Sequence, residues 1–208
     1  MGMSAAELIP PRPTLRRLRE AAAGCTACPL WKPATQTVFG EGPARARMML
    51  VGEQPGDRED IEGHPFVGPA GRELDRGLEA AGIERRDVYL TNVVKHFKYK
   101  ARGKRRIHQK PDAAEIRACL PWLEAELDVL KPEALVCLGA VAAQALLGRD
   151  FRVTRQRGVP VDSPLAPLVT ATIHPSAILR LRDDDERATE REVFAADLRA
   201  AAGALAAR

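Results

Sequence analysis

Aromatic residues and long apolar runs are both scarce in this sequence. Phe, Trp and Tyr make up only 4% of the 208 residues, although hydrophobic residues as a whole make up 45%. No apolar run approaches the roughly 20 residues of a membrane-spanning helix, so the sequence predicts none. Because no Ser/Gly-rich linker or change of composition divides the chain, we expect a single domain over residues 1–208.

A secretory signal is also missing from the first residues. Residues 1–13 contain Glu7 and three prolines, and they show no basic stretch followed by an apolar one. We therefore expect a cytoplasmic protein in which residues 1–13 form a flexible N-terminal segment.

Cysteine is limited to four residues. Cys25 and Cys28 are separated by two residues, and Cys119 and Cys137 follow much later with seventeen residues between them. In a reducing compartment such a set favours a metal site over disulfides. Two ordinary buried thiols or a redox pair at Cys25 and Cys28 are the alternatives. Four thiolates suit a structural zinc ion or an iron–sulfur cluster, and the spacing alone does not choose between them.

Carboxylates are absent from Lys95–Lys110, which holds eight lysines and arginines in sixteen residues. The other 192 residues carry 24 Lys and Arg against 28 Asp and Glu, so the positive charge of the chain is local. A focused basic segment on a slightly acidic body attracts a polyanion such as nucleic acid. His108 lies within this segment, beside several of its cations. The alternative is a solvated loop without a partner.

Four apolar runs have the length and composition of buried strands, and helical patterns alternate with them. The predicted strands cover 48–52, 88–92, 134–139 and 168–173; the predicted helices cover 14–24, 70–82, 112–130, 140–147 and 184–206. This alternation predicts an α/β fold of three layers with a four-stranded parallel sheet between helices. In such folds the ligand lies at the carboxyl ends of the strands.

Polar, Gly-rich and Pro-rich segments follow the predicted strands at that edge, and they carry a family resemblance. Gly52-Glu53-Gln54-Pro55-Gly56, Pro65–Gly71, Thr91-Asn92 and His174–Arg180 resemble the motifs of the iron–sulfur uracil-DNA glycosylases over about residues 20–200. Gln54 and the inserted loop Lys104–His108 resemble the UdgX subfamily more specifically. The resemblance implies a uracil-DNA glycosylase-like fold with a [4Fe–4S] cluster on the four cysteines. It also implies a bacterial, cytoplasmic protein that joins the nucleoid when it binds uracil-containing DNA, single-stranded as well as duplex. The sequence shows no heptad seam or exposed apolar helix, so we expect a monomer.

The resemblance further implies a role for each residue of the motifs. A base-excising enzyme flips its target nucleotide into a pocket and reads it there by stacking and hydrogen bonds. Phe66 is the expected stacking platform, and the Asn92 amide is expected to pair with uracil O4 and N3–H. His174 is expected to donate to uracil O2, where charge develops as the glycosidic bond breaks. Gln54 and Asp57 complete the expected uracil-binding set.

Glu53 and His108 are the residues expected at the sugar. Glu53 can stabilise the sugar cation, orient a water or accept a proton, and the sequence does not rank these roles. His108 is expected to capture the cation and to leave the protein linked to C1′ of the abasic site. A phosphate contact is the alternative for His108. The cations expected to bind DNA phosphates are Lys98, Lys100, Arg102, Lys104, Arg105 and Arg106.

Two other functions are compatible with the same residues. A conventional glycosylase would let water capture the sugar and would release the abasic DNA. A non-enzymatic iron–sulfur protein that binds damaged DNA would use the basic segment and would not need Glu53.

Overall fold

The computed structural model describes residues 4–207. Its main sheet has four parallel strands in the order β2-β1-β5-β6, and every residue of these strands is buried. The strands are β1 Met48–Gly52, β2 Val88–Asn92, β5 Ala134–Leu138 and β6 Leu168–Thr172. The predicted parallel sheet is therefore confirmed, and two of its strands end one residue earlier than expected. Apolar residues cover both of its faces, as continuous apolar strands require.

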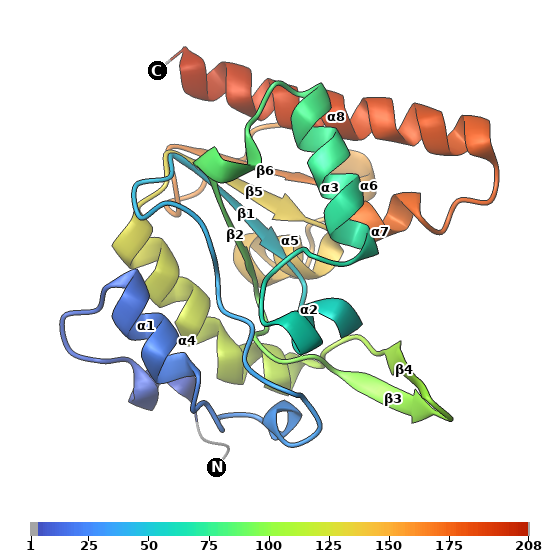
Figure 1. Cartoon of the computed structure of the whole chain (residues 1–208). Helices are drawn as coiled ribbons and strands as arrows, with labels where there is room; N and C mark the ends of the chain where they lie inside the picture. Colours follow the sequence, from blue (N-terminus) through green and yellow to red (C-terminus); the bar gives the residue numbers. More distant parts are fainter. Residues whose placement is uncertain (1–3, 208) are drawn as a thin grey trace.

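Helices cover both faces of the sheet (Figure 1). One apolar core lies between the sheet and the helices α1 Leu15–Ala22, α4 Ala113–Leu130 and α5 Ala140–Leu147. A second core lies between the other face and the helices α3 Pro69–Ala80 and α8 Asp184–Ala206. This arrangement is the three-layer α/β/α fold that the alternation of strands and helices predicts.

Short helices complete the backbone and occupy several of the connections. They are α2 Asp57–Glu62, α6 Val153–Gln156 and α7 Pro175–Ile178, with 3₁₀ helices η1 Ala5–Leu8, η2 Pro29–Trp31 and η3 Arg85–Asp87. η1 falls within the segment 1–13 that the sequence predicts to be flexible, and its Ala5 is fully buried. Residues 1–3 of that segment lie outside the described residues. Among residues 4–207, no helix is long and apolar enough to cross a membrane.

The basic segment folds into a β-hairpin, where the sequence predicts a loop. Strands β3 Tyr99–Arg102 and β4 Arg105–His108 pair antiparallel, with Tyr99 opposite His108. The turn contains Gly103, whose φ of +59° is readily adopted by glycine. The hairpin extends beyond the main sheet on the side of α2 (Figure 1). His108 therefore lies at the base of the hairpin, close to the body of the protein, and the turn lies farthest out.

Candidate active site

The carboxyl ends of β1 and β2 bring three of the predicted site residues together. Gly52 pairs in register with Asn92, so the side chain of Asn92 lies over the glycine backbone. A Cβ atom on Gly52 would lie 2.4 Å from Asn92 Oδ1 and 2.7 Å from Phe66 Cζ. Only glycine leaves room for both side chains there. The backbone of Glu53, the next residue, accepts a hydrogen bond from the Val94 amide at 3.0 Å.

Phe66 forms one wall of this site and is held rigidly. Its φ of +56° is unusual for a bulky residue, and its side chain is buried. Arg85 Nη2 donates to the carbonyls of Pro65 and Phe66, each at 3.1 Å. The Phe66 ring stacks on the imidazole of His174, with centroids 6.1 Å apart and planes inclined by 29°. Such a fixed aromatic wall suits stacking of a planar base.

Two polar atoms of this site have no hydrogen-bond partner. Among residues 4–207, the buried side-chain atoms in this condition are Glu53 Oε1, Asn92 Oδ1 and His96 Nδ1. Most buried polar atoms in folded proteins are hydrogen-bonded, because an unpaired one costs free energy. Asn92 lies over Gly52, the residue before Glu53, so both atoms lie at the same end of the sheet, where we place the binding pocket.

His174 presents a hydrogen-bond donor to the same pocket. The backbone N–H of Ser176 donates to Nδ1 at 3.2 Å, and the Ser176 hydroxyl lies 2.8 Å from the same nitrogen. Burial, with the nearby charges of Arg180 and His108, lowers the pKa of His174 to about 4. The imidazole is therefore neutral at pH 7. Because Nδ1 accepts hydrogen bonds, the proton resides on Nε2, which is free to donate.

His108 lies close to Glu53 at the base of the hairpin. His108 Nε2 and Glu53 Oε1 are 3.6 Å apart, which is an ion-pair distance but too long for a hydrogen bond. Burial and the charge of Arg180 lower the pKa of His108. Burial raises the pKa of Glu53, and the charges of Lys110 and Arg180 oppose that increase. The uncharged, nucleophilic form of His108 is thereby favoured at neutral pH.

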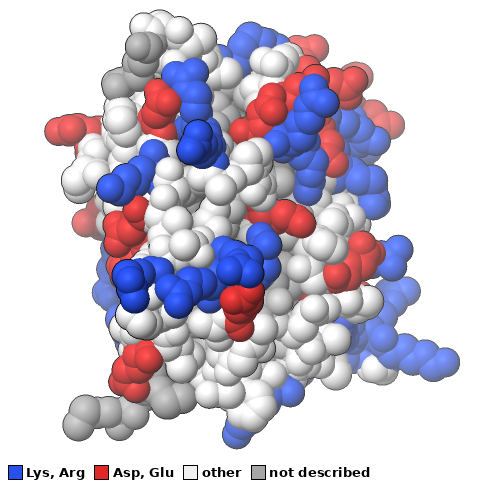
Figure 2. All heavy atoms as spheres, turned by 60° about the vertical axis from the view of Figure 1, so that its left-hand side comes forward, with Lys and Arg blue, Asp and Glu red and all other residues white. Residues whose placement is uncertain are grey.

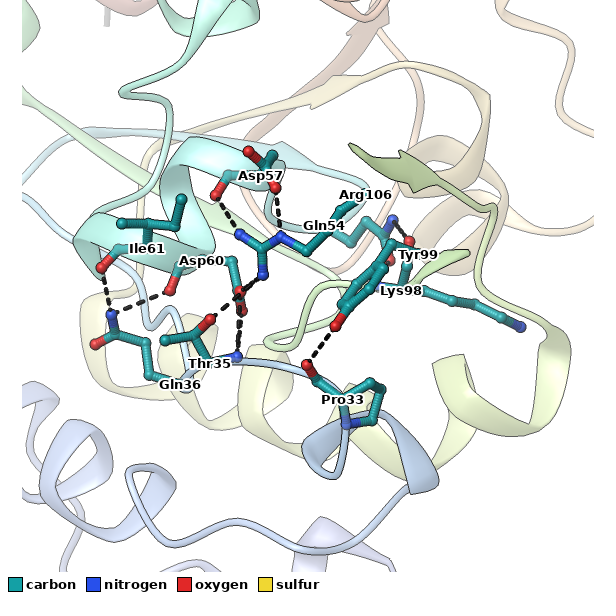
Figure 3. Close-up of polar contacts among 10 residues, drawn as sticks. All are labelled: Pro33, Thr35, Gln36, Gln54, Asp57, Asp60, Ile61, Lys98, Tyr99 and Arg106. Carbon is teal, nitrogen blue, oxygen red and sulfur yellow. Dashed lines mark hydrogen bonds and ion pairs between the residues drawn. The ribbon is translucent and has the colours of Figure 1, made fainter. Parts of the chain in front are cut away.

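Gln54, which the sequence predicts to contact uracil, is bound to the hairpin in this structure. Its Nε2 donates to the carbonyls of Lys98 and Gln109 at 3.2 and 3.0 Å. Its Oε1 accepts from the backbone N–H of Lys98 at 3.0 Å. Both amide hydrogens are therefore used, and the side chain joins the two ends of the hairpin. Figure 3 shows its contact with Lys98.

Arg106 likewise anchors the hairpin, although the sequence predicts a DNA contact. Its guanidinium donates to Asp57 Oδ1 and to the buried Asp60 Oδ2, each at 2.5 Å. It also lies over the rings of Phe97 and Tyr99, 5.5 and 5.1 Å from their centroids. Figure 3 shows Arg106 beside Tyr99. Asp57, predicted to bind uracil, is thus occupied by Arg106. An arginine that bridges two carboxylates and lies over two aromatic rings fixes a strand in place.

Lys98 is also paired with carboxylates instead of facing solvent. Its Nζ lies 2.7 Å from Glu115 Oε2 and 3.3 Å from Asp112 Oδ2. The other four predicted DNA-binding cations are exposed, and they form no ion pair within residues 4–207; they are Lys100, Arg102, Lys104 and Arg105. The hairpin therefore presents a smaller set of free cations than its composition suggests. Over the face of the molecule in Figure 2, positive and negative side chains are intermixed.

The sequence was compared with known proteins. A model of the uracil DNA glycosylase superfamily matches residues 39–199. A type-4 uracil-DNA glycosylase of Thermotoga maritima is 40% identical over 164 residues, which cover 78% of this chain and 82% of the relative. The chain belongs to the uracil-DNA glycosylase superfamily. A type-4 uracil-DNA glycosylase of Pyrobaculum aerophilum is 36% identical over 173 residues, covering 80% of this chain and 85% of the relative. The resemblance seen in the sequence is thus confirmed for the superfamily, while the UdgX assignment stays a prediction.

The four cysteines of this superfamily member are buried, and none forms a disulfide. All four lie in the core between the sheet and α4. Burial raises the pKa of Cys119 to about 12, and the thiols of Cys28 and Cys25 add to that increase, so these three lie near one another. Burial alone raises the pKa of Cys137 to about 12. Within residues 4–207, no three His, Cys, Asp or Glu side chains are arranged as a metal site. Four buried thiols have the chemistry and the burial of iron–sulfur ligands. Their sulfur atoms are not in a ligating arrangement in this structure.

Two cations near the pocket were not predicted as site residues. Arg180 donates to the Ser176 hydroxyl at 3.0 Å, and its charge acts on Glu53, His108 and His174. Lys110 acts on Glu53 from the other side. Arg180 ends the His174–Arg180 motif, so its position in the sequence was a usable signal. Both cations are exposed.

Proposed function

We propose that this protein excises uracil from DNA and that His108 then forms a covalent bond to the sugar. Membership of the uracil-DNA glycosylase superfamily supports the excision step. The observation that carries the proposal is the pair of unpartnered buried atoms, Glu53 Oε1 and Asn92 Oδ1, beside the ring of Phe66. The first atom serves the sugar, and the second serves the base.

The pocket matches the hydrogen-bonding pattern of uracil. Asn92 Oδ1 can accept from uracil N3–H while the amide nitrogen donates to O4. Cytosine offers an acceptor and a donor at these positions, so both groups of Asn92 would be left unpaired. Sites built this way reject the wrong ligand strongly, because a buried unpaired group costs about 1–3 kcal/mol. Phe66 supplies the stacking surface, and His174 Nε2–H can reach O2.

Bond cleavage places negative charge on uracil and positive charge on the sugar. The electron pair of the bond between C1′ and N1 leaves with uracil, and His174 stabilises the charge that develops at O2. Glu53, half-buried and placed beside the sugar in this proposal, stabilises the cation at C1′. The lone pair of neutral His108 Nε2 then forms a bond to C1′. The proton of the resulting imidazolium passes to the uracil anion directly or through solvent, which balances the reaction.

A conventional glycosylase is the second candidate, and a denaturing gel separates the two. The protein is mixed with a labelled single-stranded oligonucleotide that contains one uracil, and a thymine oligonucleotide is the control. A uracil-dependent band that migrates slowly after denaturation is the expected result. Free abasic DNA that accumulates over many turnovers would show that water, and not His108, captures the sugar. With neither product, the non-enzymatic DNA-binding alternative would be favoured.

A [4Fe–4S] cluster on Cys25, Cys28, Cys119 and Cys137 is part of this proposal. The proposal is supported by the four thiols, which are buried in one core and come from residues 25–28, α4 and β5. The cluster would cross-link these parts of the chain and would do no redox chemistry, since glycosidic cleavage transfers no electrons. Iron and acid-labile sulfide at about four of each per chain are expected. Purified, folded protein without iron would contradict the assignment.

The exposed hairpin cations are expected to set the salt dependence of DNA binding. Replacing Lys100, Arg102, Lys104 and Arg105 together by Gln removes up to four phosphate contacts. The slope of log K against log salt for single-stranded DNA then becomes shallower by up to about 3, because each contact contributes about 0.7. Fluorescence anisotropy at several salt concentrations measures this slope. Lys98→Gln is the matched control and leaves the slope unchanged, since Lys98 is paired with Glu115. An unchanged slope in the fourfold variant would mean that the hairpin does not contact the backbone of DNA.

A further inference from the structure

A fully buried ion pair lies directly beneath the uracil-reading residue, and the reaction above does not use it. Lys95 Nζ and Glu126 Oε2 are 2.5 Å apart, and both side chains are 0% exposed. Lys95 follows β2 by three residues, and Glu126 projects from α4. Removing two charges from water is costly, and apolar residues of similar size are often as stable or more so. The pair therefore calls for an explanation other than stability.

Lys95 uses all three of its ammonium hydrogens in hydrogen bonds. It donates to Glu126 Oε2 at 2.5 Å, to Thr91 Oγ1 at 2.7 Å and to the backbone carbonyl of Asn92 at 2.7 Å. The last contact closes the turn that carries Asn92. An ammonium group has three donors and no acceptor, so its hydrogen-bonding capacity is saturated.

Glu126 is equally saturated, and its partners come from separate parts of the chain. Its Oε1 accepts from Tyr89 OH at 2.8 Å, from Thr91 Oγ1 at 3.0 Å and from the Gly40 amide at 3.1 Å. The network therefore joins α4, β2 and the loop that precedes β1. Fully satisfied buried networks of this kind hold one geometry, because any movement breaks several bonds in a medium of low dielectric constant.

The Asn92 turn is also held from the side of the pocket. The Val93 amide donates to the Gly52 carbonyl and the Val94 amide donates to the Glu53 carbonyl, each at 3.0 Å. These bonds fix the turn to β1, and Lys95 fixes it to α4. The Asn92 side chain is left over Gly52 with an unpartnered Oδ1. Because that oxygen forms no hydrogen bond within residues 4–207, the backbone of Asn92 must supply the orientation.

We propose that Lys95 and Glu126 are positioning residues that hold the Asn92 amide in the geometry that reads uracil. This inference rests on the proposed function and adds two residues to it. Uracil and cytosine differ at the atoms that Asn92 contacts, so the angle of the amide decides both rate and discrimination. A displacement of about 1 Å at such a contact can cost roughly 10²-fold in rate.

The test replaces the pair without leaving a buried charge. Lys95→Met with Glu126→Gln keeps the side-chain volumes and lets the Gln amide accept from Tyr89 and Gly40. Uracil release is measured in single-turnover experiments, and a fall of about 10²-fold is expected. Tyr89→Phe is the matched control: it removes a buried hydrogen bond to Glu126 but leaves the contact between Lys95 and Asn92 in place. Its rate is expected to stay within about twofold of wild type.

Combining these changes with Asn92→Ala distinguishes positioning from general destabilisation. If Lys95 and Glu126 act through Asn92, the double replacement lowers the rate no further once Asn92 is Ala. An equal fall in both backgrounds, or a folded double variant with the wild-type rate, would overturn the inference. Circular dichroism and iron content establish that each variant is folded.

If Lys95→Met with Glu126→Gln does not fold, Glu126→Gln alone is tested in its place. Its rate of uracil release is expected to fall approximately tenfold, and this fall is expected to disappear in the Asn92→Ala background. A wild-type rate for folded Glu126→Gln would contradict the inference in that case. Wild-type protein that releases no uracil would instead overturn the proposed function, so the two failures are distinguishable.

Discussion

His108→Ala is expected to abolish the covalent product while uracil release continues. The imidazole nitrogen that lies 3.6 Å from Glu53 Oε1 is lost, and no group that could bond to C1′ is introduced. Phe66, Asn92 and His174 take their positions from β1, β2, β6 and the loops beside them, so the pocket is unaffected. The adduct band on a denaturing gel should vanish, and abasic DNA should appear in its place. Wild-type amounts of adduct would disprove the assignment of His108.

Lys104→Ala is the matched control for this experiment. Lys104 lies in the same hairpin, is exposed and forms no ion pair within the described part of the chain. Its replacement changes the charge of the hairpin but leaves the anchors at its base in place. The yield of adduct at saturating DNA should equal that of wild type. A loss of adduct in both variants would point to DNA binding by the hairpin instead of bond formation by His108.

The anchors of the hairpin would hold His108 in place for the nucleophilic role that we propose. Gln54 joins both ends of the hairpin, and Arg106 is fixed between two carboxylates and two aromatic rings. Tyr99 OH donates to the Pro33 carbonyl at 2.9 Å, which attaches the hairpin to a third segment (Figure 3). These contacts place His108 before DNA arrives, which lowers the entropic cost of bond formation.

The sheet and its helices were predictable because their signals are local. The runs 48–52 and 88–92 are apolar throughout, as strands covered on both faces must be, and both are observed with those bounds. α4 begins after Asp112, which forms a capping box with Glu115. The hairpin was not predicted, because its strands alternate basic residues with few apolar ones. Its folding depends on contacts from distant segments.

The ion pairs of the hairpin also join segments that are far apart in the sequence. Lys98 and Arg106 look like free cations in the sequence, because their carboxylate partners lie 14 or more residues away along the chain. Lys95 was counted with the basic segment, although the fold buries it against Glu126. Sequence motifs predict the residues that we propose to meet the base and sugar. They did not identify the residues that support them, since a supporting contact has no fixed spacing.

His174→Ala is expected to slow uracil release by about 10²–10³-fold. This is the cost of removing one well-placed donor from a site where negative charge develops in the transition state. The donor is Nε2–H, because the Ser176 amide donates to Nδ1 and the low pKa of about 4 keeps the ring neutral. A neutral donor of this kind needs no protonation, so the rate should not fall as the pH rises from 6 to 8 on account of His174. Single-turnover uracil release across that range measures both effects.

Ser176→Ala tests whether the Ser176 hydroxyl is needed to orient the His174 ring. The Ala variant loses the hydroxyl but keeps the backbone N–H that donates to Nδ1, so the tautomer of His174 is preserved. A loss of about tenfold or less is expected, since one neutral hydrogen bond contributes about 0.5–1.5 kcal/mol. The hydroxyl also receives a hydrogen bond from Arg180, so that cation is freed as well. If Ser176→Ala were as slow as His174→Ala, the hydroxyl would be essential for the orientation of the ring. If His174→Ala kept the wild-type rate, charge at uracil O2 would have to be stabilised by another group, and the pocket described here would be misassigned.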